Sequence, residues 1–338
     1  PEEPVTRAEF VKLLLAVQGL SPQSPTAAEL RAIAAVPRKP AIPASHWLQT
    51  QGWMDVALAH GLVVAADYDA RGYEPDKLTN RRELMIMAGR TLGLVQPAQA
   101  MAAQPPALPY TDASTVPAWA RSWVKVAADS GVVTGYPDGS IRTEVPLTRA
   151  EAVVVAQRVK AKAAAGANPG ATVQVEVTLP YDGTGWHYKQ IPLSVPVVFD
   201  GAVPLVPIKP VYDTAREYYA AQAGKFYAGQ PGKWQWNPVM QSLYLDHYGE
   251  AALRYTAGTT AWQIEMSAFG TQPQTAAVPA RLINGTLYAS YGSFLYGCCV
   301  LPSLPPAGAA SEGTPRYDAA RNLLVVPVRP PIDPPNPS

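Results

Sequence analysis

The phrase Val5-Thr6-Arg7-Ala8-Glu9 occurs three times in the first half of the chain. It returns as Leu147-Thr148-Arg149-Ala150-Glu151, and Thr79-Asn80-Arg81-Arg82-Glu83 is a more divergent copy between them. The glutamates that close the copies are 74 and 68 positions apart, which indicates an array of related modules with insertions. A repeated module of this size favours a binding surface over an enzyme.

Each copy carries the residues of a helix start. Thr6, Asn80 and Thr148 can each cap a helix N-terminus, and the glutamate three positions later can close a capping box. Apolar residues at helical spacing follow, for example Phe10 and Leu14 in the first copy, and the stripe is weaker in the third. The sequence therefore predicts three helices that begin at these phrases.

An arginine follows each cap, at Arg7, Arg81 and Arg149. A cation in the first turn of a helix gains nothing from the helix dipole. Two interpretations are open. Each arginine is either a surface residue packed along its stem, or it is held beside free N–H groups and together with them binds an anion.

A further helix is predicted before the second and third copies. Trp53 and Trp123 each stand eight residues before a glycine, Gly61 or Gly131, that suits a helix C-cap. The turn Gly135-Tyr136-Pro137-Asp138-Gly139 follows in the third copy, where the second has a longer segment. A complete unit is therefore a helix, a Gly-terminated turn, an extended loop and a capped helix.

These units resemble the S-layer homology family, which combines a His-Trp-Ala-like helix start, a Gly-Tyr-Pro-Asp-Gly turn and a Thr-Arg-Ala-Glu helix. The third unit, 110–160, is a close match, and the second, 41–94, keeps Ser45-His46-Trp47 but not the turn. The first, 1–40, is partial, because only four residues precede Val5. We hypothesise that its missing helix is supplied by the second half of this chain or by another copy.

The resemblance implies a pseudo-threefold helical bundle whose grooves hold an anionic, often pyruvylated, secondary cell-wall polysaccharide. Carried over by motif, the polysaccharide contacts would be Arg7, Arg81, Arg149, Trp47, Trp119, Gly135 and Gly139.

Composition limits the function classes. Charged residues make up 16% of the 338 residues and the formal net charge is +1, so no basic surplus points to nucleic acid. No apolar run reaches the roughly 18 residues of a membrane-spanning helix. The length allows two or three domains.

The pattern changes after a linker at 161–171. Residues 172–179 alternate as a half-buried strand, and a second strand at 191–199 is expected at a sheet edge because it contains Pro192 and Pro196. The predicted fold class is therefore α+β multidomain: a helical pseudo-threefold bundle, then a β-rich domain of hairpins with short helices.

Residues 172–328 contain two related units. Each has a predicted hairpin, a helical candidate and an aromatic turn before a last strand. In the first unit these lie at 197–207, 214–223 and 233–245, and in the second at 280–289, 291–298 and 316–326. This order resembles the copper amine oxidase N-terminal domain. The four histidines form no His-x-His pair and the oxidase tyrosine motif is absent, so no catalytic residue, metal site or cofactor is predicted.

Three further features are open to interpretation. Cys298-Cys299 are either buried thiols or a link between protomers, and His46 is expected to be a helix-start or packing residue. The Pro-rich tail, 329–338, is predicted to be an extended polyproline-like arm. Aromatic residues are dense between 212 and 296, which suits an interface and favours a homo-oligomer or polymer.

Two functions remain. The first is a non-catalytic extracellular envelope protein that anchors to cell-wall polysaccharide, or assembles into a surface layer or filament. The alternative is a secreted enzyme or ligand-binding protein that the helical units anchor to the wall.

Overall fold

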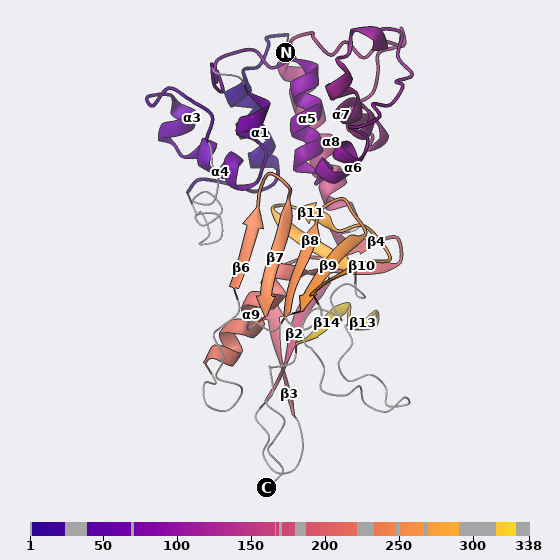
Figure 1. Cartoon of the computed structure of the whole chain (residues 1–338). Helices are drawn as coiled ribbons and strands as arrows, with labels where there is room; N and C mark the ends of the chain where they lie inside the picture. Colours follow the sequence, from indigo (N-terminus) through magenta and orange to yellow (C-terminus); the bar gives the residue numbers. More distant parts are fainter. Residues whose placement is uncertain are drawn as a thin grey trace. The chain divides into compact units, whose positions relative to one another are not determined.

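A computed structural model of the chain has two compact units, and the predicted α+β class is confirmed (Figure 1). The helical unit comprises Pro1–Ala164, Trp236–Ser242 and Arg281–Gly285, and the β-rich unit comprises Ala165–Gln235, Leu243–Ala280 and Thr286–Ser338. The structure describes residues 2–23, 39–68, 71–165, 167–168, 171–179, 187–221, 233–247, 251–266, 270–290 and 316–328. Outside these residues lie Cys298-Cys299, the helical candidate 291–298 and the tail 329–338.

The three phrases each begin a helix of the helical unit. The helices α1 (Arg7–Val17), α5 (Arg81–Thr91) and α8 (Arg149–Ala164) all start at the arginine of their phrase. The described residues of this unit also form α3 (Trp47–Thr50), α4 (Trp53–Ala59), α6 (Val95–Ala100) and α7 (Ala118–Asp129), with short 3-10 turns at Ala65–Asp67 and Ala113–Thr115.

The three predicted N-caps are formed, but the capping box expected at Asn80 is not: Asn80 accepts the N–H of Glu83 at 2.9 Å, and the Glu83 carboxylate pairs with Arg7 instead. Thr6 and Glu9 make a complete capping box, and the Thr148 hydroxyl accepts the N–H of Glu151 at 3.2 Å while the Glu151 carboxylate accepts the N–H of Thr148 at 3.0 Å. Gly61 and Gly131 follow the ends of α4 and α7 with φ of 68° and 71°, the left-handed conformation that ends a helix. Local sequence therefore fixes where these helices begin and end.

A ring of backbone hydrogen bonds joins the three phrases. Val5 N–H donates to the carbonyl of Leu147 (2.9 Å), Leu147 N–H to that of Thr79 (2.8 Å), and Thr79 N–H to that of Val5 (2.9 Å). Each phrase thus donates to one neighbour and accepts from the other, which gives the three helix starts a pseudo-threefold arrangement.

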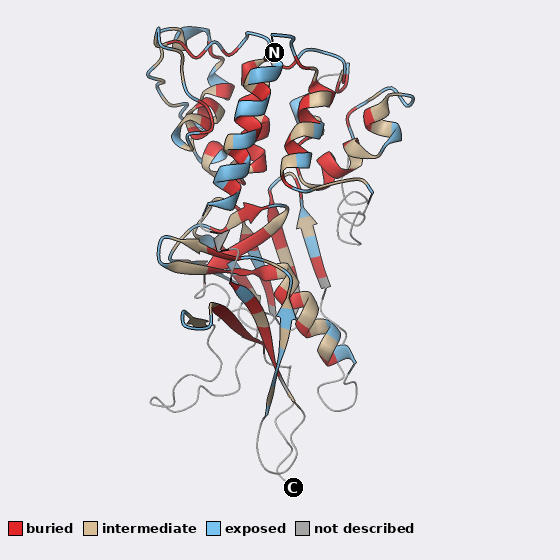
Figure 2. Cartoon of the chain, turned by 180° about the vertical axis from the view of Figure 1, so that it is seen from behind, coloured by how far each residue is buried: buried red, intermediate tan, exposed pale blue. Residues whose placement is uncertain are grey.

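The core of the helical unit lies between α1, α5, α8 and the helices packed on them. Figure 2 shows buried residues along these helices; α1 and α8 also carry exposed residues, whereas every residue of α5 is buried or half-buried. Phe10, Leu14, Leu84, Met85 and Val159 are all fully buried at 0% exposure, and they belong to one continuous apolar cluster.

The described strands form three sheets, and the helix α9 (Ile208–Ala220) belongs to the β-rich unit. The strand orders of these sheets are β1-β4-β5-β12-β11, β10-β9-β8-β7-β6 and β13-β14-β2-β3. The strands are β1 (Ala167–Asn168), β2 (Thr172–Thr178), β3 (Tyr188–Leu193), β4 (Val197–Asp200), β5 (Val203–Pro207), β6 (Lys233–Asn237), β7 (Ser242–His247), β8 (Ala251–Thr256), β9 (Ala261–Met266), β10 (Gly270–Thr275), β11 (Arg281–Ile283), β12 (Thr286–Ser290), β13 (Arg316–Asp318) and β14 (Leu323–Val328).

The two predicted hairpins lie in one sheet. β4 and β5 form the first, β11 and β12 the second, and β5 pairs antiparallel with β12. Two β-rich predictions need correction. The strand expected at 191–199 is two strands, β3 and β4, in different sheets, and only β3 with its Pro192 is an edge strand. The helix expected at 214–223 begins earlier, at Ile208. Pro210 is compatible with this start because it lies in the first turn, where its missing N–H removes no intrahelical bond.

Candidate functional site

The arginine of each phrase pairs with the glutamate of the next phrase around the ring. Arg7 pairs with Glu83, with its Nε donating at 3.1 Å. Arg81 Nη1 lies 3.3 Å from Glu151 Oε1. Arg149 Nη1 lies 3.7 Å from Glu9 Oε1, which closes the cycle. We call the place where two neighbouring phrases meet a junction. Each of the three junctions holds an arginine–glutamate ion pair, but the residues that cover this pair differ from one junction to the next.

The junction between the first and second phrases is enclosed. The Arg7 side chain is 7% exposed, its Nη1 donates to the carbonyl of Tyr73 at 2.7 Å, and its guanidinium lies 5.4 Å from the centre of the Tyr68 ring. Burial alone would lower the pKa of Arg7, but hydrogen bonding and attraction to Glu83 outweigh it and raise that pKa. This guanidinium is neutralised inside the protein.

The junction between the second and third phrases is enclosed in the same way. The Arg81 side chain is also 7% exposed, and it donates to the carbonyls of Ile141 (3.1 Å) and Thr134 (3.2 Å). Tyr136 lies over the Arg81 guanidinium at 4.7 Å and donates its hydroxyl hydrogen to Glu151 at 2.7 Å. Burial and the Glu151 carboxylate raise the pKa of Tyr136, so this hydroxyl keeps its proton.

The glycine turn shapes the loop that carries Tyr136. Gly139 has a φ of 79°, which favours glycine, and its carbonyl accepts the N–H of Thr111 at 3.0 Å. A Cβ on Gly135 would lie 3.0 Å from the ring of Tyr110. These two glycines therefore position a loop over Arg81, and neither belongs to the residues that line the pocket described next.

The third junction is open. The Arg149 side chain is 54% exposed, and its described ion-pair partners are Glu3 at 3.6 Å and Glu9 at 3.7 Å. Among the described residues, no aromatic ring lies over Arg149. Arg149 is therefore the one arginine of the cycle whose guanidinium faces solvent.

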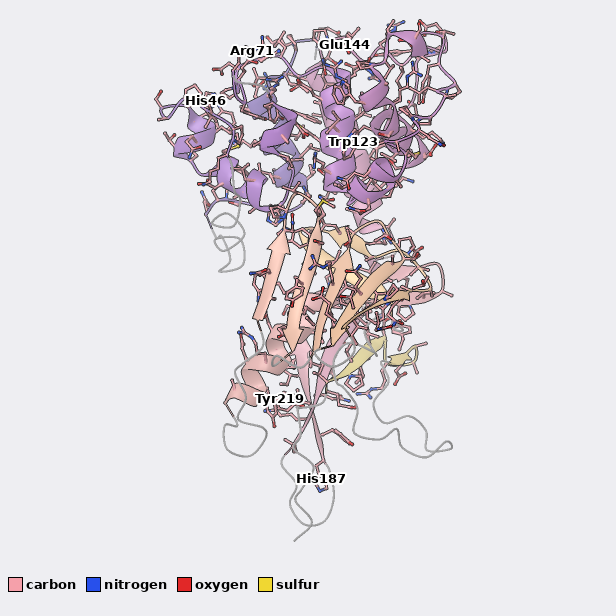
Figure 3. All side chains as sticks on the ribbon, in the orientation of Figure 1. His46, Arg71, Trp123, Glu144, His187 and Tyr219 are labelled. Carbon is pink, nitrogen blue, oxygen red and sulfur yellow. The ribbon has the colours of Figure 1, made fainter. Side chains whose placement is uncertain are left out.

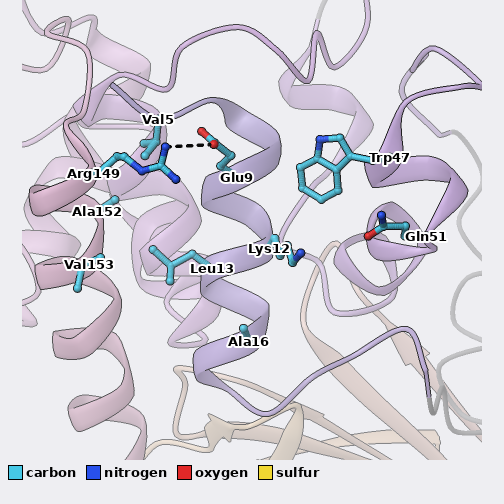
Figure 4. A pocket seen from close by; sticks show the side chains of 10 residues that line it. All are labelled: Val5, Glu9, Lys12, Leu13, Ala16, Trp47, Gln51, Arg149, Ala152 and Val153. Carbon is cyan, nitrogen blue, oxygen red and sulfur yellow. Dashed lines mark ion pairs between the residues drawn. The ribbon is translucent and has the colours of Figure 1, made fainter. Parts of the chain in front are cut away.

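Beside Arg149 lies a pocket of about 570 Å³ between α1, α3 and α8. In Figure 4, α1 runs down the middle of the pocket, with α8 on one side and α3 on the other. The lining residues are Val5, Glu9, Lys12, Leu13, Ala16, Trp47, Gln51, Arg149, Ala152 and Val153. A single ion pair, Arg149 with Glu9, crosses its upper end.

A second cation enters the pocket from α1. The Lys12 ammonium lies 5.3 Å from the ring centre of Trp47 and 5.4 Å from that of Trp53, which fixes its place by cation–π attraction. The pocket therefore combines two cations, one carboxylate, an indole and small apolar side chains. This combination can hold an anionic ligand that also has an apolar face.

The structure separates the seven residues that the resemblance implied. Arg149 and Trp47 line the pocket, whereas Arg7 and Arg81 are buried in ion pairs, so the three arginines share no common cavity. Trp119 lies on α7 with 60% exposure, and the Arg82 guanidinium lies 5.5 Å from its ring centre.

Sequence reasoning missed Lys12 and Glu9 as pocket residues. Lys12 is the one charged residue in the apolar run from Phe10 to Leu15, which was an available signal. Glu9 was predicted only as the closing residue of a capping box. Its Oε2 does accept the N–H of Thr6 at 2.9 Å, and this leaves Oε1 facing Arg149.

The described residues contain no group of three His, Cys, Asp or Glu side chains that could hold a metal ion. None of their helices has the length and apolar character to cross a membrane. His46 and His187, both labelled in Figure 3, belong to different units of the chain.

Comparison with known proteins identifies the third repeat. Residues 109–153 match the S-layer homology domain, and this range contains Trp119, the glycine turn and Arg149. No curated protein matches the chain. The resemblance of 172–328 to the copper amine oxidase N-terminal domain is not supported by these comparisons and stays a prediction. S-layer homology domains bind cell-wall polysaccharides, so the domain at 109–153 associates this chain with the cell surface or cell wall.

Proposed function

We propose that the helical unit anchors the protein to an anionic cell-wall polysaccharide through the pocket between α1, α3 and α8, and that it does so without catalysis. The observation that carries this proposal is the open junction, where Arg149 is 54% exposed beside Lys12 and Trp47. Its two counterparts, Arg7 and Arg81, are buried and already neutralised by half-buried glutamate partners.

The lining suits a sugar that carries a carboxylate. A guanidinium binds a carboxylate through a planar fork of N–H donors, and Glu3 already approaches Arg149 at 3.6 Å. Glu3 is 80% exposed, so a ligand carboxylate can replace it at little cost. The Trp47 ring offers an apolar face to the C–H face of a sugar. A pyruvyl ketal supplies both a carboxylate and a methyl group, and Leu13 and Val153 line the pocket where such a methyl would lie.

The test is retention on purified wall sacculi, before and after hydrofluoric acid removes their secondary polymers. Arg149→Ala should weaken binding about tenfold or more, since a hydrogen bond to a charged group contributes about 1.5–3 kcal/mol. Lys12→Ala and Trp47→Ala should weaken it too. Lys125→Ala is the matched control, because it removes one exposed cation from α7, where Lys125 pairs with Asp129.

Two results would contradict the anchoring proposal. One is wild-type protein that untreated sacculi do not retain. The other is a Lys125→Ala variant that loses as much affinity as Arg149→Ala, because binding would then depend on overall charge rather than on the pocket.

We also propose that the β-rich unit assembles copies of the chain into a surface layer or filament. The strand β10 supports this, because it is the outermost strand of its sheet among the described residues and five of its six residues are exposed. An exposed edge strand can pair with another chain. Electron microscopy of the purified full chain should show ordered assemblies, and a homogeneous monomer at high concentration would contradict the proposal.

A further inference from the structure

One wall of the pocket is a helix too short to be stable alone. α3 has four residues, Trp47–Thr50, and it presents Trp47 and its C-terminal neighbour Gln51 to the pocket. A single helical turn fixes many dihedral angles for few hydrogen bonds. The position of the Trp47 ring therefore depends on the contacts that hold the start of α3.

His46 holds that start without lining the pocket. Its Nδ1 accepts the N–H of Leu48 at 3.1 Å, and its Nε2 lies 3.1 Å from Asp76 Oδ1 in the segment before α5. The His46 side chain is 9% exposed, and its ring centre is 5.3 Å from that of Trp47. Figure 3 labels His46, which directly precedes the first residue of α3.

These two contacts require the neutral imidazole. Nδ1 must carry no proton in order to accept from Leu48, so the proton is on Nε2, which donates it to Asp76. An imidazolium donates from both nitrogens, and its Nδ1–H would face the Leu48 N–H with no acceptor between them. Protonation of His46 therefore removes the cap of α3.

The charged partner of this ring among the described residues is Asp76, which is 81% exposed, so solvent weakens its attraction for an imidazolium. Lys12, on α1, contacts the neighbouring Trp47 ring instead, with its ammonium 5.3 Å from the ring centre. Neither group replaces the lost hydrogen bond to Leu48.

We propose that His46 is a positioning residue for Trp47. As the neutral imidazole it holds α3 at the pocket, and when it is protonated α3 and the Trp47 ring are free to move away from the pocket. Acidification then weakens polysaccharide binding. The effect on binding rests on the function proposed for the pocket, whereas the movement of Trp47 can be measured without any ligand.

The first experiment follows two NMR signals of the ligand-free full chain, the Leu48 amide and the Trp47 indole N–H, between pH 8 and pH 5. The indole signal is assigned with Trp47→Phe. His46→Asn is the decisive variant, because an asparagine side-chain oxygen caps a helix and does not titrate. His46→Ala removes the acceptor at every pH.

In the wild type, both signals should move between pH 8 and pH 5, the range in which histidine changes charge. In His46→Asn and in His46→Ala neither signal should move over this pH range, because neither side chain titrates there. The other histidines are unchanged in both variants. A Trp47 signal that does not move in the wild type, or that moves equally in His46→Asn, would overturn the proposal.

The second experiment measures retention on untreated wall sacculi at pH 8 and pH 5. Between these pH values the apparent Kd of the wild type should rise about fivefold, the factor that loss of one helix cap produces, and that of His46→Asn should not. Equal pH dependence in both proteins overturns the link to binding. If the NMR titration holds but no protein is retained at either pH, the positioning role stands and the proposed wall-binding function fails.

Discussion

The carboxylate of Glu83 accepts hydrogen bonds from the guanidinium of Arg7, which lies 76 positions earlier in the chain. The pair is well shielded from water, with exposures of 7% for Arg7 and 16% for Glu83. It links the first phrase to the second, and the same design recurs between Arg81 and Glu151. Buried pairs of this kind make the fold of the helical unit sensitive to loss of either partner.

Glu83→Ala should therefore lower the free energy of unfolding by up to about 3–5 kcal/mol, because it leaves the buried Arg7 guanidinium with only the partly exposed Glu74, at 3.5 Å, as a counter-charge. Urea unfolding measures this change. Glu144→Ala is the control, since Glu144 pairs with Arg82 and is 53% exposed, and should cost less than about 1 kcal/mol. Equal losses in the two variants would show that the buried pair has no special role.

Thr79→Val should stabilise the protein. Thr79 is 0% exposed, and its hydroxyl has no hydrogen-bond partner among the described residues. The other two phrases have Val5 and Leu147 at this position. Replacing an unpaired buried hydroxyl by a methyl group should raise the unfolding free energy by about 1 kcal/mol, measured by urea unfolding. Thr143→Val is the contrast: its hydroxyl does have a partner, Glu144, so this variant should not gain stability.

The cap of α8 offers a third test. The Thr148 hydroxyl accepts the N–H of Glu151 at 3.2 Å. Thr148→Ala should cost about 1 kcal/mol of stability, and Thr148→Ser, which keeps the hydroxyl, should cost much less. Thermal unfolding of the two variants beside the wild type checks this. A serine variant as unstable as the alanine variant would mean that the methyl group, rather than the cap, matters.

Glu151 should make stability depend on pH. Its burial alone would raise the pKa of this carboxyl, but hydrogen bonds from Thr148 and Tyr136 and the charge of Arg81 outweigh burial and lower it. A carboxyl whose pKa is lowered by folding stabilises the protein above its unfolded pKa of about 4.3, and this stabilisation is lost as pH falls through the folded value.

The stability gap between wild type and Glu151→Gln should therefore be largest near pH 7 and should shrink below about pH 4. Urea unfolding at a series of pH values measures it. Glu144→Gln is the control, because the Glu144 side chain is exposed. A gap that stays constant down to pH 3 would mean that the ionised form of Glu151 does not stabilise the fold.

Prediction from sequence succeeded where the cause is local. Thr6, Thr148 and Gly131 act through their own backbone within a few residues, so their pattern places helix ends correctly. It failed where the cause is not local. Strands β8, β9 and β10 were not predicted, because their stability comes from pairing with one another.

The sequence by itself determined three capped helices, their repeat and the three arginines that begin them, since each of these is set by residues close together in the chain. Only the tertiary structure decided which arginine is available. Tyr68 covers Arg7 and Tyr136 covers Arg81, whereas Arg149 faces the pocket beside Lys12. The physical reason is that the charge of an arginine is free for a ligand only where no loop from another repeat neutralises and buries it, and that depends on which segments fold together.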